Sequence, residues 1–117
     1  MLFEFPGVII IEPKVFYDLR GYFYESYKKE IFDSKIGIFD VVQENESKST
    51  YGVLRGIHFQ KGDNAQAKLV RVLKGKVIDV AVDLRKSSPT FTKYVMVELS
   101  DKNKRQLFVP RGFGHAY

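Results

Sequence analysis

Short apolar or alternating runs follow one another along the chain, and residues that favour turns separate them. The first clear run covers residues 8–11 and is bounded by Gly7 and Pro13. Such spacing predicts an all-β sandwich or barrel rather than alternating β and α units. The number of expected strands suggests a jelly roll. They are residues 8–12, 22–27, 41–49, 53–59, 68–73, 77–83, 94–99 and 106–109.

One segment, residues 28–34, has the character of a helix. It is only about two turns long, so it needs packing against the rest of the fold to be stable. No repeat, linker or low-complexity tract interrupts the pattern, and 117 residues with 44% hydrophobic content suit one core. The chain is therefore expected to form a single domain over residues 1–117.

The strand expected at residues 77–83 places Asp79, Ala81 and Asp83 on one face and aliphatic residues on the other. Two interpretations account for acids on a strand face. Either the strand is half-exposed and its acids lie in water, or Asp79 points into a polar cavity and orients a histidine or lysine there. The alternation alone leaves both open.

Composition narrows the chemistry. Cysteine is absent, which excludes disulfides and thiolates from these residues. Nineteen Lys and Arg against fourteen Asp and Glu give a net charge of +5, which favours a small anionic ligand. Nucleic acid is not expected, because the basic residues are spread along the chain. No apolar run approaches the roughly 20 residues of a membrane span, and no signal peptide is evident, so a cytoplasmic protein is expected.

The chain has only two histidines, and the first of them, His58, lies in the strand-like segment GVLRGIHFQ. Regular alternation would place Arg55 and His58 on opposite faces. Gly56 could change this arrangement, because a glycine inside a strand often marks a bulge. A bulge would bring both side chains to the same side. His58 is thus either a packed strand residue or, with Arg55, part of a site.

The second histidine, His115, ends a Pro-x-Gly-x-x-His motif that resembles the second sequence motif of the cupin superfamily. Metal-binding cupins supply further ligands from a His-x-His pair and a following Glu in their first motif. In this chain the pair reads His58-Phe59-Gln60, and no Glu occurs between Gln60 and Glu98. No metal site is therefore expected from these motifs.

Six segments taken together resemble the dTDP-4-dehydrorhamnose 3,5-epimerase family. They are DLRGYFYE at 18–25, QENES at 43–47, GVLRGIHFQ at 52–60, AQAKLVR at 65–71, DVAVDLRKSSPTF at 79–91 and VPRGFGHAY at 109–117. The resemblance implies a cupin-like jelly roll (double-stranded β-helix) that forms a homodimer and works without metal or organic cofactor. It also implies a part in dTDP-rhamnose biosynthesis for surface polysaccharides such as lipopolysaccharide.

The activity that the resemblance implies is inversion of C3 and C5 of dTDP-4-dehydro-6-deoxy-D-glucose, which gives dTDP-4-dehydro-L-rhamnose. Removing a proton next to a ketone forms an enolate, so a site for this reaction needs a base and a positive group near the developing oxyanion. By resemblance His58 is the base and Lys68 stabilises the enolate. Read without the resemblance, Lys68 is a solvated lysine at a strand edge.

Further residues of the site follow from the same resemblance. Arg55 is expected to bind the diphosphate, for which a planar guanidinium is well suited. Asp79 and His115 are expected to support Lys68 and shape its surroundings. The remaining expected substrate contacts are Gln43 and Asn45 within one chain, and Arg20, Phe23 and Glu25 across the dimer interface.

The chain departs from the family pattern in two ways. Small swaps occur in the last motif, where the usual Gly-Phe-Ala-His-Gly-Phe is replaced by residues 112–117. A tyrosine taken as the general acid and an aspartate that pairs with the catalytic histidine have no counterpart, and a C-terminally shortened jelly roll with an open sheet edge is expected. The alternatives are a nucleotide-sugar-binding jelly roll without full catalysis, or a related 3- or 5-epimerase.

Overall fold

A computed structural model describes residues 2–5, 7–37, 40–60 and 65–117. Strands dominate these residues, with one short helix among them. The elements are β1 (Leu2–Phe5), β2 (Val8–Ile11), β3 (Val15–Asp18), β4 (Gly21–Tyr24), α1 (Lys29–Lys35), β5 (Lys68–Arg71), β6 (Lys76–Asp83), β7 (Tyr94–Ser100), β8 (Gln106–Val109) and β9 (Phe113–Ala116). The prediction of an all-β fold with one helix near residues 28–34 is confirmed.

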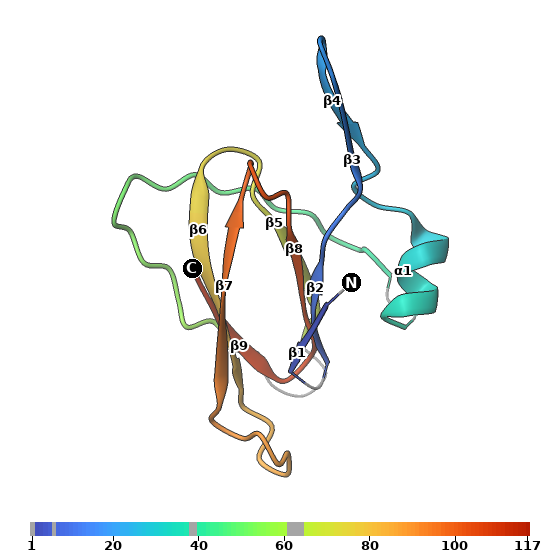
Figure 1. Ribbon diagram of the computed structural model, residues 1–117. Coiled ribbons are helices and arrows are strands. Elements are labelled where there is room, and N and C mark those ends of the chain that lie inside the picture. The colour runs from blue at the N-terminus through green and yellow to red at the C-terminus, as the bar shows by residue number, and fades with distance from the viewer. Residues whose placement is uncertain (1, 6, 38–39, 61–64) are drawn as a thin grey trace.

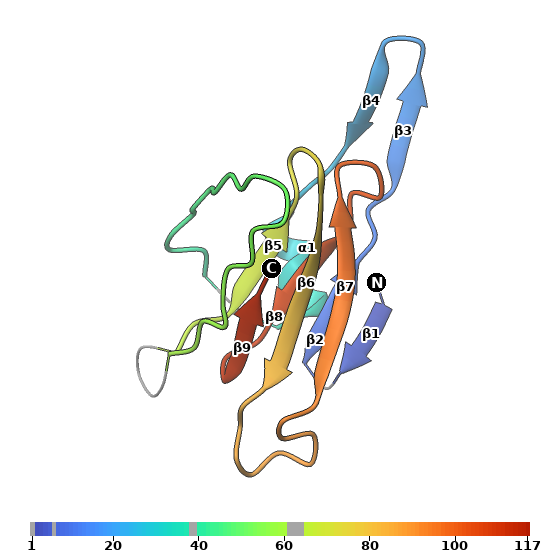
Figure 2. The ribbon, with the colours of Figure 1, turned by 90° about the vertical axis from the view of Figure 1, so that its left-hand side faces the viewer.

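Two antiparallel sheets face each other (Figure 1). One has the strand order β1-β2-β8-β5 and the other the order β7-β6-β9. Strands β3 and β4 form a separate hairpin that projects beyond one end of the sandwich in both views (Figures 1 and 2). No helix in the described part of the chain has the length and apolar character to cross a membrane.

The main core fills the space between the two sheets. Its fully buried members come from β2, β6, β7, β8 and β9 and are Val8, Ile10, Ala81, Val97, Leu99, Leu107, Val109 and Phe113. Burial of a side chain the size of Val, Leu or Phe stabilises a fold by about 1.5–3 kcal/mol. Packing between the sheets is therefore the main source of stability, as expected for a chain without disulfides.

Helix α1 covers the outer face of the β1-β2-β8-β5 sheet (Figure 1). Phe32 is its buried residue, and it packs with Ile9, Ile11 and Phe108. Strand β2 thus has its even-numbered residues in the main core and its odd-numbered residues beneath α1, which explains a continuous apolar run at residues 8–11. A helix this short depends on such packing.

Two of the expected strands do not form. Residues 41–50 are exposed and have no ladder partner in the described part of the chain, and residues 53–59 form only isolated backbone pairs. An extended segment becomes a strand only where a neighbouring strand offers free hydrogen-bonding groups. Conversely, β1, β3 and β9 were not predicted. Strand β9 contains Gly114 and Ala116, which are weak strand formers, and pairing with β6 imposes its extended backbone.

Strand β6 settles the question of its acidic face. Asp79, Ala81 and Asp83 are fully buried, whereas Ile78 on the opposite face is 47% exposed. The interpretation of acids in water is therefore wrong, because the face that carries them is turned toward the other sheet. A buried carboxylate must be paired to be tolerated, and the two acids have different partners.

Asp83 organises the connection from β6 to β7. Its carboxylate accepts hydrogen bonds from the Arg85 backbone N–H and from the Arg85 guanidinium, all at 3.0 Å, and from the Ser88 and Thr90 hydroxyls at 2.6 and 2.5 Å. The Arg85 side chain, followed by the two hydroxyls, lowers the pKa of Asp83 well below its ordinary value. The segment Asp83–Thr90 is therefore a structural turn held by one buried carboxylate.

Replacement of Asp83 by asparagine is expected to destabilise the fold by about 2–4 kcal/mol, because the buried hydroxyl and guanidinium donors would lose their anionic acceptor. Urea unfolding at pH 7 measures the effect, with Asp40→Asn as the exposed control. A group with a lowered folded pKa stabilises the fold above its unfolded pKa, and this stability is lost as the pH falls. The difference between the original protein and Asp83→Asn should therefore shrink below about pH 4; a pH-independent difference would contradict this assignment.

Candidate functional site

Residues 55–58 lie along the edge of β9 that faces away from β6. The backbone N–H of Arg55 donates to the Tyr117 carbonyl at 2.7 Å and the Tyr117 N–H donates back at 2.9 Å. His58 and His115 exchange a second pair of bonds at 2.9 and 3.0 Å. The edge of the β7-β6-β9 sheet at β9 is thus partly paired within the same chain.

The register of these pairs contains a bulge at Gly56. Three steps along the chain separate Arg55 from His58, but only two separate their partners, His115 and Tyr117. One extra residue is therefore accommodated on the outer segment, and both Arg55 and His58 share the face of His115. The bulge predicted from Gly56, and the common side for Arg55 and His58, are confirmed.

Only glycine fits at position 56. Its φ angle is +138°, and a Cβ atom placed on it would lie 2.6 Å from the Cβ and 2.8 Å from the Cα of Ala116, and 2.9 Å from the His115 carbonyl oxygen. Two of these three atoms belong to the backbone of β9, so they cannot give way as the end of a side chain would. Gly56 thus sets the close approach that places His58 beside His115.

Asp79 and His115 form the buried polar centre of the sheet. His115 pairs with Ala81, so its ring lies diagonally across from Asp79 on the inner face. The Nε2 atom of His115 and the Oδ1 atom of Asp79 are 2.6 Å apart, and both side chains are at least 96% buried. The two atoms do not form a hydrogen bond, and their contact is an ion pair when His115 is protonated. Asp79 thus lies beside a histidine, as one of the two interpretations predicted.

Lys68 faces this centre from the opposite sheet. It pairs with Val109 on β8. Val109 and Val70 belong to the core between the sheets, whereas Leu69 packs in the outer layer beneath α1. Because residues i and i+2 of a strand share a face, Lys68 points into the space between the sheets. It is half-buried, and its ammonium group makes no hydrogen bond or ion pair with any described residue.

His58 is exposed, and its imidazole has no hydrogen-bond partner within the described ranges. His58 pairs with His115, which in turn pairs with Ala81, so the three side chains follow one another across the sheet and His58 is the outermost. A neutral imidazole with a free ring nitrogen can accept a proton from a ligand. The facing sides of the two sheets therefore carry a free imidazole, a free ammonium group and a buried carboxylate–histidine pair.

Arg55 and Tyr117 hold residues 47–49 against the site. The Arg55 guanidinium donates to the Ser49 hydroxyl at 2.8 Å and to the Lys48 carbonyl at 2.9 Å. The Tyr117 hydroxyl shares a hydrogen bond of 2.9 Å with Ser47. Sequence reasoning gave Tyr117 no role in the site. The spacing of the two residues could have indicated this role, because a residue two positions after His115 in a strand shares its face.

Gln43 and Asn45 are exposed in the irregular segment that precedes Ser47. The Gln43 amide donates to the Asn45 side-chain oxygen at 3.2 Å, so the two side chains lie on one side of the backbone, as predicted from their i and i+2 spacing. They belong to the segment that was expected to be a strand and is not. Their position relative to Arg55 depends on the contacts at residues 47–49.

Arg20, Phe23 and Glu25 lie apart from these groups, on the projecting β3–β4 hairpin and its exit (Figures 1 and 2). All three side chains are exposed. At the hairpin turn the Arg20 guanidinium binds Asp18 at 2.7 Å and lowers the pKa of that carboxyl. One chain therefore does not bring these three residues to its own His58 and Lys68.

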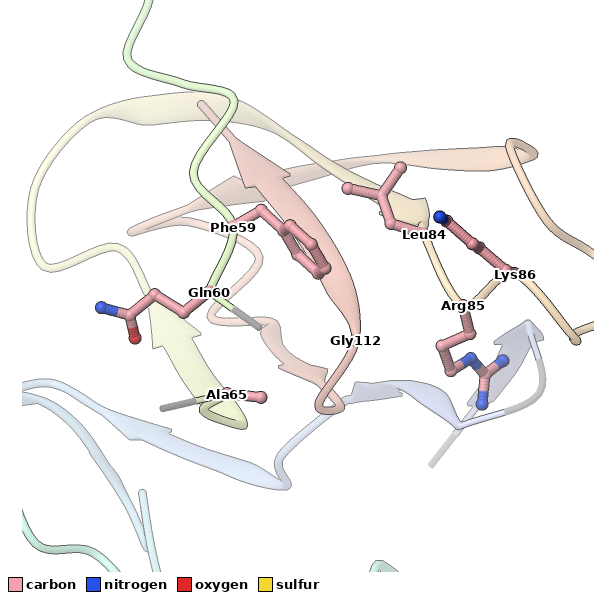
Figure 3. Close-up of a pocket in the computed structure, with 7 residues that line it drawn as sticks. All are labelled: Phe59, Gln60, Ala65, Leu84, Arg85, Lys86 and Gly112. Carbon is pink, nitrogen blue, oxygen red and sulfur yellow. The ribbon is translucent and has the colours of Figure 1, made fainter. Parts of the chain in front are cut away.

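A shallow hollow of about 320 Å³ adjoins the site (Figure 3). It is lined by Phe59, Gln60, Ala65, Leu84, Arg85, Lys86 and Gly112. Neither His58 nor Lys68 lines it, and its arginine is bound to Asp83. Among the described residues no three His, Asp or Glu side chains gather as metal ligands would.

Comparison with known proteins places this geometry in a family. The family model described as dTDP-4-dehydrorhamnose 3,5-epimerase matches residues 3–117. The dTDP-4-dehydrorhamnose 3,5-epimerase of Salmonella typhimurium is 58% identical over 113 residues, which are 96% of this chain and 62% of that protein.

Solved structures of related epimerases share the fold. The dTDP-6-deoxy-D-glucose-3,5-epimerase of Legionella pneumophila, in complex with dTDP-4-keto-L-rhamnose, has a TM-score of 0.91 at 50% identity and covers 97% of this chain and 61% of its own. An epimerase of Mycobacterium tuberculosis has a TM-score of 0.92 at 40% identity and covers 98% and 58%.

The chain spans 58–62% of the length of these three relatives. Within that span the likeness to the solved epimerases confirms the cupin-like jelly-roll class. The match runs from residue 3 to residue 117 and includes all six segments on which the resemblance was based. The chain belongs to the dTDP-4-dehydrorhamnose 3,5-epimerase family.

Proposed function

We propose that the protein epimerises C3 and C5 of dTDP-4-dehydro-6-deoxy-D-glucose and so forms dTDP-4-dehydro-L-rhamnose. The observation that carries this proposal is the bulge at Gly56, which turns Arg55 and His58 to the same inner face as His115. Lys68 approaches that face from the opposite sheet. A base and a cation for a diphosphate are thus supplied by residues 55–58, and a cation for an oxyanion is supplied by β5.

Proton removal is assigned to His58. A proton on a carbon next to a ketone becomes acidic when the resulting negative charge can move to the ketone oxygen. The exposed His58 imidazole, without a partner in the described part of the chain, is available to accept that proton. The same base would act at both C3 and C5, since both carbons flank the C4 ketone.

Stabilisation of the enolate is assigned to Lys68. Its ammonium group is half-buried and makes no ion pair with a described residue, so its charge is not neutralised before substrate binds. A preorganised cation beside a developing oxyanion typically lowers the barrier by several kcal/mol. Asp79 and His115, buried on the facing sheet, are assigned to maintain the polar environment of Lys68.

Arg55 is assigned to the diphosphate. Two of its nitrogens already bind Ser49 and the Lys48 carbonyl, which fixes the plane of the guanidinium and leaves donors for a ligand. Gln43 and Asn45, in the irregular segment that precedes Ser47, would contact the nucleotide part. Arg20, Phe23 and Glu25 would serve the site of a second copy in a homodimer, with the Phe23 ring stacking on the base.

The scheme uses only side chains of this protein, in keeping with Gln60 at the position where metal-binding cupins have a second histidine. Inversion also requires a proton on the opposite face of the sugar, for which no described residue is assigned. Two outcomes other than double inversion are therefore tested alongside it. They are inversion at one carbon only, and nucleotide-sugar binding without proton exchange.

The test is incubation of the protein with the 4-keto-6-deoxy sugar nucleotide in deuterated water, followed by NMR at C3 and C5. Deuterium at both carbons is the expected result. Deuterium at only one carbon would show that the protein carries out a single epimerisation. Binding of dTDP without exchange would replace the proposal by a binding function, and absence of both would overturn it.

A further inference from the structure

The β3–β4 hairpin, residues 15–24, stands away from the sandwich as an arm (Figure 2). A hollow of about 420 Å³ lies between the outer part of the hairpin and the sandwich, lined by Tyr17, Tyr22, Leu73, Asp101, Lys102 and Lys104. A two-stranded hairpin alone is marginally stable at best. The direction of the arm must therefore depend on specific contacts near its base.

Four polar residues of the sandwich supply such contacts, and we call them the bracket. Three are consecutive in sequence. Lys104 places its ammonium 3.9 Å from the centre of the Tyr22 ring, Arg105 binds Glu12 at 2.9 Å, and Gln106 donates to the Ser26 carbonyl at 2.7 Å. The fourth is Arg71, which pairs with Gln106 across the sheet and donates to the Tyr24 hydroxyl at 3.1 Å.

The bracket holds both connections of the arm. Glu12 lies just before β3, and Ser26 lies just after β4, so Arg105 and Gln106 each fix one of the two crossings. Tyr22 and Tyr24 lie on one face of β4 and are held along the strand. Two contacts on β4 and one on each connection together fix the angle between the arm and the sandwich, whereas a single contact would let the arm rotate about it.

The base of the bracket is itself rigid. Asn103 accepts hydrogen bonds from the backbone N–H groups of Ser100 and Arg105 at 3.1 and 2.9 Å, and donates to the Glu98 carbonyl at 2.9 Å. Lys104 has a φ angle of +54°, which is uncommon for a residue with a side chain. Such a conformation persists where the surrounding structure determines it. The turn therefore presents Lys104 to Tyr22 in a fixed direction.

The bracket decides which face of the arm is free. Phe23 lies opposite Phe16 across the hairpin, on the face that Tyr22 and Tyr24 do not use. Phe16 and Phe23 are 55% and 73% exposed. Because the tyrosine face is turned to the bracket, the phenylalanine face is turned away from its own sandwich.

We propose that Arg71, Lys104, Arg105 and Gln106 are positioning residues that hold the arm at one angle and so aim Phe23 and Glu25 at the nucleotide in the partner copy. What the arm is aimed at rests on the proposed function; that the bracket fixes its angle does not. Gln106 is buried, but the contacts of Arg71, Lys104 and Arg105 are partly exposed, and such contacts add little to global stability. Their effect is expected in the direction of the arm.

The test uses the absence of cysteine, which allows two labels to be placed cleanly. Leu19→Cys at the fully exposed turn and Met96→Cys on β7 carry spin labels, and unlabelled protein dilutes the sample so that distances within one chain are measured. The double variant Tyr24→Phe with Lys104→Met removes two contacts of the arm, the Arg71–Tyr24 hydrogen bond and the cation–ring contact, together with the Lys104 hydrogen bond to the Asp101 carbonyl. We expect a clearly broader distance distribution, with the urea midpoint almost unchanged.

Tyr22→Phe is the matched control, because it keeps the ring beneath Lys104 and removes a hydroxyl that makes no hydrogen bond with the described residues. The Tyr22→Phe variant should retain the narrow distance distribution of the protein with Tyr22. In the exchange assay the double variant should raise KM about three- to tenfold without lowering kcat, as expected for two weak contacts that act through binding. An unchanged distance distribution in the double variant would overturn the inference, even if the proposed function stands. Absence of dTDP binding by the original protein would instead overturn the function, and the distances would still decide the inference.

Discussion

Replacement of His58 by alanine is expected to abolish deuterium incorporation at C3 and C5 while leaving dTDP affinity within about threefold. Loss of a positioned general base typically costs 10²–10⁴-fold in rate. The imidazole projects from the outer end of the row formed with His115 and is exposed, so its removal leaves no buried group unpaired. Exchange rate by NMR and dTDP binding by calorimetry separate the two quantities.

Replacement of Arg55 by alanine is expected to weaken dTDP binding, the quantity that His58→Ala leaves nearly unchanged. The guanidinium is assigned to the diphosphate, and charge-assisted hydrogen bonds of this kind contribute about 1.5–3 kcal/mol. We therefore expect dTDP affinity to fall at least tenfold. Normal exchange in His58→Ala would show that the base is another residue. A loss of dTDP binding in His58→Ala as large as that in Arg55→Ala would show that His58 acts in binding.

Local patterns predicted those parts of the site whose geometry is local. Alternation placed Asp79, Ala81 and Asp83 on one face, and the buried side of β6 carries all three. Gly56 indicated a bulge, and the register confirms that Arg55 and His58 share a face. In each case the deciding factor was backbone geometry over a few residues, which sequence expresses directly.

Parts that depend on distant partners could not be predicted in this way. The segment at residues 41–49 was predicted to be a strand, but it has no ladder partner in the described structure. Strand β9 forms despite Gly114 and Ala116 because β6 pairs with it. The arm is held by contacts whose two partners lie 47 or 80 positions apart in the sequence, and no local pattern contains such contacts. Family resemblance named the arm residues but not what orients them.

Replacement of Gly56 by alanine is expected to have the largest effect on the fold, a destabilisation of about 3 kcal/mol or more. The added methyl would meet two backbone atoms of β9 at 2.8 and 2.9 Å, and the φ angle of +138° is unfavourable for alanine. Either β9 or residues 55–58 must move, which separates His58 from His115. Urea unfolding measures the stability, and dTDP binding by the folded fraction measures the site.

Two further variants isolate the cause of this effect. Gly52→Ala is the matched control, since Gly52 has a φ angle of +86° but no atom within 4 Å of the added methyl. It should lose only about 1–2 kcal/mol, the conformational cost of a left-handed residue. Adding Ala116→Gly to Gly56→Ala removes the 2.6 Å contact but keeps the two backbone contacts, so it should restore only part of the lost stability. If Gly56→Ala were no less stable than Gly52→Ala, close packing against β9 would not be what places His58, and the positioning of the base would have to come from the residues that flank it.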